Sequence, residues 1–374
     1  MKKYGVGVIG CGRISKTYLN NMTTKFSILN VVGVSDVIEE RSLQRSQEFN
    51  VRQMTNEEIY GSDEIDIVVN LTFPPSHHEV TMAALKAGKH VYCEKMMAVK
   101  IEEGNEQVAM AEKAGRHLVI APDTFLGGGL QTCRKLIDAG MIGEPRSAVA
   151  HIIRGTLQME PEPVNTRMPL LPGGGIQFDM GSYYLSALIN MLGPISRVTG
   201  FSKTYDKEFL NVQNPKFGAH IPIETPNLAV GALEFKSGVI GTFLTSSESF
   251  PSPQRLEVHG TEGILLCSDP NTFGGPVTLL RKADGRSEPF VMPLTHGYTV
   301  GCNRGMGVAE LAWSIEKHRK PRLQMGYHDF EVACAIWQAT FDNKTHIMKS
   351  SPERPAALPS GYVEQQIMET ALAV

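Results

Sequence analysis

The sequence predicts an α/β fold in two parts: a parallel sheet covered by helices, followed by an α+β domain with a large, mostly antiparallel, open sheet. Short apolar runs alternate with helical patterns through the first third of the chain, and this alternation is typical of parallel strands joined by helices. From residue 196 to 292, β segments follow one another with turns rich in Gly, Pro and Asp between them. We place the boundary between residues 1–122 and 123–374, where Pro122 and the glycines at 127–129 interrupt the first pattern.

The elements expected in the first part alternate strictly between strand and helix. The run over 65–71 is apolar throughout, as expected of a strand buried on both faces, and Gly88 is a plausible C-cap for the helix before it. In chain order we expect a strand over Val6–Ile9, a helix, a strand ending at Asp36, a helix over 39–49, a strand over Ile65–Leu71, a helix over Ser76–Lys86, a strand over His90–Cys93, a helix over 101–114 and a strand over His117–Ala121.

The second part begins with a helix near residues 130–139 and a strand around Ala148–Arg154. A Pro-rich loop over 156–174 leads to a helix that begins around Gln177. After the β segments, helices return at about 305–318 and 328–341, and the residues from 350 onward read as a polar extension.

The composition is that of an ordinary soluble globular protein. A length of 374 residues allows two domains, each with its own core, and 42% of the residues are hydrophobic. The net charge of −3 gives no electrostatic reason to expect nucleic acid or an anionic membrane as a partner. No apolar run approaches the roughly 20 residues of a membrane helix, and the N-terminus lacks the pattern of a secretory signal. We therefore expect a cytoplasmic protein.

The cysteines and histidines are scattered. The 6 cysteines form no CxxC pair, so we expect reduced thiols rather than disulfides. The 11 histidines form neither an HxxxH motif nor a cluster with cysteine, so we expect no metal site.

The first strand ends in a glycine pattern, Gly10-Cys11-Gly12-Arg13-Ile14-Ser15, that leads into a helix. Gly10 permits a tight turn, Gly12 lets a phosphate approach the backbone, and Ser15 is small enough for close packing of helix on strand. Asp36, at the end of the second strand, can accept hydrogen bonds from a ribose hydroxyl. Together these features favour a Rossmann domain that binds a dinucleotide over a turn with a purely structural role.

Further cofactor contacts are expected at the carboxyl ends of the strands, where ligands of such sheets bind. His78 is equally compatible with a capping or solvated histidine. Asp36 favours NAD because its carboxylate repels a 2′-phosphate, whereas Arg41 leaves some room for NADP. The candidates beyond the glycines and Asp36 are Arg13, Ile14, Arg41, Thr72, Pro74, His78, Glu94 and Lys95.

Two further stretches carry candidate catalytic groups. We expect Lys95 at the end of a buried strand. It either takes part in the chemistry on the substrate or contacts the phosphate or ribose of the cofactor. Asp179 and Tyr183 follow a run of glycines at helical spacing, which places them on one face of a helix. Alternatively, Asp179 only caps that helix and the tyrosine belongs to the core. Gly181 costs such a helix about 1 kcal/mol relative to Ala, so we expect a close packing contact there.

These motifs together resemble the Gfo/Idh/MocA oxidoreductase family, which includes glucose–fructose oxidoreductases, inositol dehydrogenases and related sugar enzymes. The resemblance runs through nearly the whole chain. It implies a nicotinamide cofactor in the first domain, a substrate over the open sheet of the second, and homo-oligomers, often dimers or tetramers, formed by packing sheet faces together. The residues that carry it are Gly10–Ile14, Asp36, Glu94-Lys95, Gly174-Gly175, Asp179–Gly181, Tyr183, Gly260–Gly263 and Arg304–Ala312.

The resemblance also implies roles. Lys95 matches the lysine of the family's EKP motif, with Met96 in place of the proline, so that the turn is less rigid. Asp179 matches the aspartate of DxGxH, and Tyr183 stands where many members have a catalytic histidine and some have tyrosine. An ammonium group about 4 Å from a tyrosine contributes about 4 kcal/mol at an effective dielectric near 20, which could move its pKa from about 10 towards 7 before any effect of burial. Asp179 opposes this shift and keeps Lys95 charged. Lys95 is an alternative base.

The expected function is therefore an NAD-dependent dehydrogenase or reductase for a secondary hydroxyl of a sugar, polyol or glycoside. Tyr183, supported by Lys95, removes the hydroxyl proton while hydride passes to the nicotinamide, and Asp179 orients the pair. His151 and Arg154 are candidate substrate contacts if they lie on the sheet face. Three alternatives stay open: a glycoside 3-dehydrogenase that serves a cleavage pathway, a redox-neutral NAD-dependent glycosidase, and a catalytically silent dinucleotide sensor.

Overall fold

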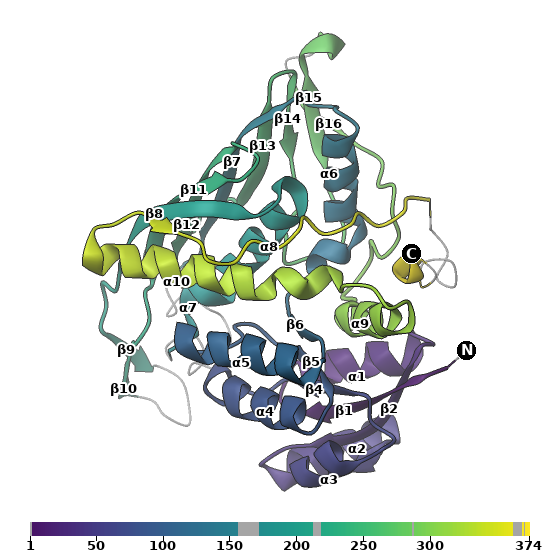
Figure 1. The fold of residues 1–374 in the computed structure, drawn as a ribbon. Helices are drawn as coiled ribbons and strands as arrows, with labels where there is room; N and C mark the ends of the chain where they lie inside the picture. The colour runs from purple at the N-terminus through teal and green to yellow at the C-terminus, as the bar shows by residue number, and fades with distance from the viewer. Residues whose placement is uncertain (1, 156–171, 212–217, 286–287, 362–368, 370) are drawn as a thin grey trace.

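The computed structural model describes residues 2–155, 172–211, 218–285, 288–361, 369 and 371–374 (Figure 1). Within them the chain forms a small parallel sheet, a large mixed sheet and a separate hairpin. Most of the Pro-rich loop expected over 156–174 lies outside the described residues.

The first sheet has six strands in the order β3-β2-β1-β4-β5-β6, all paired in parallel, as predicted. Its strands are β1 (Tyr4–Ile9), β2 (Leu29–Ser35), β3 (Arg52–Gln53), β4 (Ile67–Asn70), β5 (His90–Cys93) and β6 (Leu118–Ile120). The two-residue strand β3 was not expected from the sequence, since it is too short for a periodicity to show.

The helices of this domain connect successive strands. They are α1 (Ser15–Thr24), α2 (Glu39–Phe49), α3 (Asn56–Gly61), α4 (Pro74–Lys86) and α5 (Ile101–Ala114). The bounds of α2 and α5 are those predicted. Helix α4 begins at Pro74 rather than Ser76, because a proline in the first turn lacks an N–H that would have had no helical partner anyway. The sequence analysis did not include α3.

The second sheet has nine described strands in the order β16-β15-β14-β13-β7-β12-β11-β8-β17. Strands β7 and β12 pair in parallel and the other described neighbours pair antiparallel, which confirms a large, mostly antiparallel sheet. The strands are β7 (Pro145–Ile153), β8 (Ile195–Lys203), β11 (Leu228–Phe235), β12 (Ile240–Ser246), β13 (Arg255–Gly260), β14 (Gly263–Leu266), β15 (Thr278–Arg281), β16 (Phe290–Val291) and β17 (His346–Ile347), and the hairpin consists of β9 (Glu208–Asn211) and β10 (Ala219–Pro222).

One face of this sheet is covered by helices and the other is open. Ala148, Ala150 and Ile152 of β7 are buried on the covered face, which α8 (Gly181–Leu192) and α10 (Gly326–Asp342) contact. On the open face, Phe201 is 71% exposed and Ile240 is 52% exposed. Helix α6 (Gly128–Asp138) packs against α8, and α9 (Met306–Glu316) packs against α1 and β5 of the first domain (Figure 1). The described residues also form the short 3-10 helices η1 (Thr124–Leu126), η4 (Lys282–Asp284) and η5 (Arg322–Met325).

The helix predicted to carry both Asp179 and Tyr183 is two consecutive helices. Helix α7 (Gly175–Asp179) ends before Met180, and α8 begins at Gly181. The break falls where the chain comes close to the sheet, since a Cβ on Gly181 would lie 2.6 Å from Cζ of the buried Phe243. The expected close contact at Gly181 is thus confirmed, and the expectation of one continuous helix is wrong.

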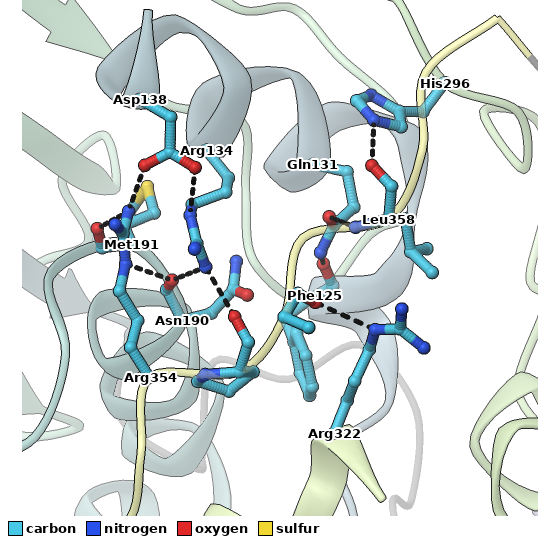
Figure 2. Close-up of polar contacts among 12 residues, drawn as sticks. Phe125, Gln131, Arg134, Asp138, Asn190, Met191, His296, Arg322, Arg354 and Leu358 are labelled. Carbon is cyan, nitrogen blue, oxygen red and sulfur yellow. Dashed lines mark hydrogen bonds and ion pairs between the residues drawn. The ribbon is translucent and has the colours of Figure 1, made fainter. Parts of the chain in front are cut away.

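The chain near its C-terminal end is not a polar extension. Residues 350–361, here called the C-terminal strap, run across α6 and α8 (Figure 2). Arg354 of the strap pairs with Asp138 and donates to the carbonyl of Asn190, and Leu358 is buried, with its N–H donating to Gln131 at 2.9 Å. Residues 369 and 371–373 are helical, and Glu369 accepts a hydrogen bond from the N–H of Ile28 in the first domain.

Among the described helices, none combines the length and the apolar character that crossing a bilayer demands.

The packing at Gly181 predicts a stability effect. In Gly181→Ala, the added methyl group meets the ring of Phe243, which is 0% exposed and has no room to move, so we expect a net destabilisation of about 1–3 kcal/mol. The measurement is urea unfolding followed by circular dichroism. The matched control is Gly61→Ala at the end of α3, where a Cβ meets nothing within 4 Å and the change should be neutral or stabilising by up to about 1 kcal/mol. Equal unfolding midpoints for Gly181→Ala and the wild type would contradict the packing described.

Candidate active site

The glycine turn after β1 has the geometry of a phosphate-binding loop. Gly10 has a φ of 101°, and a Cβ there would lie 2.6 Å from the carbonyl carbon of Leu71, so no side chain fits. A Cβ on Gly12 would meet nothing within 4 Å, which leaves its backbone open to a ligand. Ser15 is fully buried, and its hydroxyl donates to the carbonyl of Gly12 at 2.6 Å. The N-terminus of α1 follows directly and is suited to a pyrophosphate.

Asp36 lies beside this turn, at the end of β2. Its carboxylate accepts hydrogen bonds from the N–H groups of Cys11 at 2.6 Å and Ile38 at 2.8 Å. Both bonds fix the carboxylate at the position where the adenosine ribose of a dinucleotide is bound in this type of fold. Arg13 and Arg41 are exposed and Ile14 is half-buried.

The turn after β4 contacts the glycine-rich approach to α7. Thr72 donates its hydroxyl hydrogen to Asn70 at 2.6 Å, and a Cβ on Gly173 would lie 3.2 Å from Cβ of Pro74. Thr72 and Pro74 therefore lie at the carboxyl end of the sheet, as expected. His78 lies apart from them, because its Nε2 faces Glu106 of α5 at 2.9 Å.

The neighbouring His77, which the sequence analysis did not consider, occupies the strand-end position instead. It is fully buried, and its two ring nitrogens lie 2.6 Å from the carbonyl oxygen of Met96 and 2.9 Å from that of Thr72. The Lys95–Met96 peptide bond is cis, and the Met96 side chain is buried. His77 and the core thus hold the turn that carries Lys95, although the expected proline is absent. The sequence alone does not indicate which of the adjacent residues His77 and His78 faces inward.

Lys95 forms an ion pair with Asp179. The Nζ atom donates to Oδ1 of Asp179, with the lysine side chain 11% exposed and that of the aspartate 28% exposed. Burial lowers the pKa of Lys95, but Asp179, Tyr183 and Glu94 together outweigh burial and raise the pKa above its usual value. Lys95 is therefore held as an ammonium ion, and the alternative in which it is the base is not favoured.

Tyr183 packs against the same ammonium group. The Lys95 Nζ lies 5.1 Å from the centroid of the tyrosine ring, and the ring is 4% exposed. Burial raises the pKa of Tyr183, and this effect exceeds the opposing effects of Lys95 and Arg304. The shift towards 7 that the ammonium group alone could cause is therefore more than offset by burial in the protein without ligands. At neutral pH Tyr183 carries its proton.

Arg304, just before α9, is a site residue that the sequence analysis missed. Its Nη2 donates to the phenol oxygen of Tyr183 at 2.7 Å and to Oδ1 of Asn271 at 2.7 Å. The segment that contains Arg304 was part of the family resemblance, but no local pattern predicts a contact with a residue 121 positions away. Only the tertiary fold brings the two together.

Glu94 lies beside the side chains of Lys95 and Tyr18. Its carboxylate accepts hydrogen bonds from the hydroxyl of Tyr18 at 2.7 Å and from the backbone N–H of Lys95 at 3.1 Å. Tyr18 belongs to α1, the helix that follows the glycine turn. Glu94 therefore links the phosphate-binding helix to the strand end that carries Lys95.

Comparison with known proteins identifies the family. A model described as the oxidoreductase family with an NAD-binding Rossmann fold matches residues 4–121, and the GFO/IDH/MocA C-terminal domain matches residues 130–266. The chain belongs to the GFO/IDH/MocA family. It is an oxidoreductase whose N-terminal domain is the NAD-binding Rossmann domain of that family.

Named relatives of this family match most of the chain. The 1,5-anhydro-D-fructose reductase of Ensifer adhaerens is 28% identical over 302 residues, which cover 75% of this chain and 81% of the relative. The myo-inositol 2-dehydrogenase of Thermotoga maritima is 25% identical over 273 residues, covering 71% and 75%. The crystal structure of aldose-aldose oxidoreductase from Caulobacter crescentus, complexed with glycerol, superposes with a TM-score of 0.76 at 22% identity and covers 93% of this chain and 100% of that one. This last likeness shows a common fold.

The two residues predicted to contact substrate lie on different sides of the second sheet. His151 lies on the open face, opposite to the buried Ala150 and Ile152, and its Nε2 is 3.0 Å from the hydroxyl of Thr242. It is therefore not brought to the cluster of Lys95, Asp179 and Tyr183. Arg154 follows β7 and lies near Tyr184. Burial raises the pKa of Tyr184, and the positive charge of Arg154 only partly opposes this rise. Arg154 thus lies near the residue that follows Tyr183.

Among the described residues, no group of three or more His, Cys, Asp and Glu side chains is arranged to hold a metal ion.

Proposed function

We propose that this chain is an NAD-dependent dehydrogenase or reductase that acts on a secondary hydroxyl of a sugar, polyol or glycoside, with Tyr183 as the proton donor and acceptor. The observation that carries the proposal is the convergence of Lys95, Asp179 and Tyr183, although Lys95 and Asp179 are 84 positions apart. A catalytically silent dinucleotide sensor would have no need of this buried arrangement.

The cofactor fits the first domain. The open backbone at Gly12 and the N-terminus of α1 suit the pyrophosphate, and the carboxylate of Asp36 suits the hydroxyls of the adenosine ribose. The nicotinamide supplies the chemistry of hydride transfer when the dinucleotide is bound. NAD is favoured over NADP because the fixed carboxylate of Asp36 would repel a 2′-phosphate.

Tyr183 is suited to move the proton of the reaction. When a carbonyl is reduced, the carbonyl carbon gains the hydride and the carbonyl oxygen takes the phenol proton, which leaves a phenolate. When an alcohol is oxidised, the C–H bond loses the hydride and the hydroxyl proton passes to that phenolate, with formation of the C=O bond. Lys95 and Arg304, both cationic, stabilise the phenolate.

The raised pKa of Tyr183 has a consequence for direction. At neutral pH the phenol is protonated, which is the form that donates a proton to a carbonyl. The proton donor for reduction is therefore present at neutral pH. The rate of oxidation should increase as the pH rises and the phenolate becomes populated. The raised pKa of Lys95 keeps the ammonium group charged over this range.

The substrate class rests on the relatives and on the polar groups around Tyr183. The matched relatives are named for an anhydro-sugar and for an inositol, which supports a small polyhydroxylated substrate. Arg154 and Asn271 lie near Tyr184 and Arg304 respectively, and we assign them as candidate partners for substrate hydroxyls. The substrate would then lie on the covered side of the second sheet, rather than over its open face with His151.

The remaining assignments concern the whole protein. We propose residues 1–122 as the cofactor domain and 123–374 as the domain for substrate binding and oligomerisation. Exposed apolar side chains on the open face, Phe201, Val230 and Ile240, support a homo-oligomer that packs these faces together. The 6 cysteines are free thiols, which supports a cytoplasmic location.

The proposed function is tested with a panel of sugars, polyols and glycosides, with NADH absorbance as the readout. The wild type should reduce NAD with at least one member, and Tyr183→Phe and Lys95→Met should each lower turnover by roughly 100-fold to 10,000-fold, because each removes part of the proton-transfer pair. Calorimetry should show NAD binding by both variants. Tyr327→Phe is the matched control, since its hydroxyl bonds Asn105 of α5. Near-normal turnover in both site variants would contradict the mechanism, and release of an aglycone without accumulation of NADH would instead indicate a redox-neutral glycosidase.

The preference for NAD is tested at Asp36. In Asp36→Asn an amide oxygen still accepts a backbone hydrogen bond, but the charge that repels a 2′-phosphate is gone. The ratio of kcat/KM for NAD to that for NADP should fall by roughly tenfold or more. Glu39→Gln removes a nearby charge in the first turn of α2 and should leave the ratio unchanged. An unaltered ratio in Asp36→Asn would show that Asp36 does not set the preference.

A further inference from the structure

Arg304 contacts the atom on which the proposed proton transfer depends. We propose that Arg304 is a positioning residue for Tyr183: by donating to the phenol oxygen, it directs the phenol proton away from itself towards the substrate and stabilises the phenolate. This inference rests on the proposed function, in which Tyr183 moves the proton. It assigns a role to a residue outside the Lys95, Asp179 and Tyr183 set.

The hydrogen bond between Arg304 and Tyr183 has only one possible direction. A guanidinium group has donors and no acceptor, so in the 2.7 Å contact the Tyr183 oxygen accepts and the Arg304 Nη2 donates. The single proton of the phenol is therefore not part of this bond and is available to another acceptor. The second hydrogen of the same Nη2 is directed to Oδ1 of Asn271, also at 2.7 Å, which fixes the plane of the guanidinium.

The two cations near the ring of Tyr183 differ in their own partners. Lys95 lies over the ring of Tyr183, but its ammonium charge is shared with the carboxylate of Asp179. Arg304 donates instead to neutral atoms: the phenol oxygen, the Asn271 amide and, at 3.1 Å, the sulfur of Cys302. Among the described residues no carboxylate forms an ion pair with Arg304, and its positive charge lies against the oxygen on which negative charge would develop. Charge-assisted bonds of this kind are about twice as strong as neutral ones.

The loop that carries Arg304 is held by hydrogen bonds from α1 and from the segment that follows β6. Asn21 of α1 is buried, and its amide donates to the carbonyls of Cys302 at 2.9 Å and Arg304 at 2.8 Å. Asp123, after β6, accepts hydrogen bonds from the N–H groups of Gly305 at 3.0 Å and Gly307 at 2.9 Å. Gly305 has a φ of 100°, which lets the chain turn into α9 directly after Arg304. Arg304 is therefore positioned by the backbone of its loop and does not depend on Tyr183 for its place.

The test compares Arg304→Met, Arg304→Lys and Arg304→Ala with the wild type on whichever substrate the panel identifies. Arg304→Met should lower kcat by roughly tenfold to 100-fold while KM changes less, because the lost bond matters most when the phenolate forms. The pH profile of alcohol oxidation should shift to higher pH by about one unit or more. Arg304→Lys should lie between the two, since it keeps the charge and loses the planar donor pair. Added guanidinium ion should restore part of the activity of Arg304→Ala.

Arg116→Ala, at an exposed site after α5, is the matched control and should show neither the pH shift nor a response to guanidinium. A wild-type kcat and pH profile in Arg304→Met would overturn the inference. So would a loss of activity without a pH shift in Arg304→Lys and without rescue of Arg304→Ala, because that result would indicate a structural role alone.

A readout without turnover separates this inference from the proposed function. Ultraviolet difference titration of each protein against its Tyr183→Phe counterpart reports ionisation of Tyr183 directly. The pKa of Tyr183 should be higher in Arg304→Met than in the wild type, whether or not a substrate has been found, and an unchanged pKa would overturn the inference. An inactive wild type, or an active Tyr183→Phe, would instead refute the proposed function.

Discussion

The ion pair between Lys95 and Asp179 is the contact on which the geometry of the site depends. Lys95 stands at the end of a strand in the first sheet, and Asp179 ends the short helix that leads into α8. Both side chains are largely buried, so the loss of either would leave the other charge uncompensated, which commonly costs several kcal/mol. The pair therefore holds the two domains in one relation at this point and places the Lys95 ammonium over the ring of Tyr183. It also raises the pKa of Lys95, which disfavours the lysine as the base.

In the proposed mechanism, a tyrosine in place of histidine changes the pKa of the group that transfers the proton. An unperturbed histidine has a pKa of about 6.5 and exchanges protons near neutrality, whereas tyrosine, at about 10, is further raised here by burial. Lys95 and Arg304 both lower this pKa, although burial outweighs them in the protein without ligands. The second cation, Arg304, forms no ion pair with a carboxylate in the part of the chain that the structure describes, and it donates directly to the phenol oxygen. A site built on tyrosine thus has reason to use two cations, and its chemistry should respond to pH over a higher range than that of a histidine site.

Features set by local sequence were predicted well, and features set by tertiary contacts were not. The turn at Gly10 and the lysine at the end of a buried strand follow from chain periodicity and turn chemistry, and both lie where expected. The predicted cofactor contact His78 faces α5, because two adjacent helical residues point in different directions and composition does not distinguish them. Leu358 is buried within a stretch rich in proline and polar residues that shows no period. Arg304 meets its partner only through packing of α9 on the first domain, for which the sequence carries no local signal.

The most direct test of proton transfer at Tyr183 is the pH–rate profile of Tyr183→His. Histidine restores the residue that many members of the family use, in the same position and next to the same lysine. If the group at 183 transfers the proton, the variant should keep measurable turnover, and the pH at which oxidation reaches half its maximal rate should fall by more than about three units. The two unperturbed pKa values differ by about 3.5, and burial raises that of tyrosine and lowers that of histidine. A profile that coincides with that of the wild type would show that proton transfer occurs elsewhere and would contradict the central role of Tyr183.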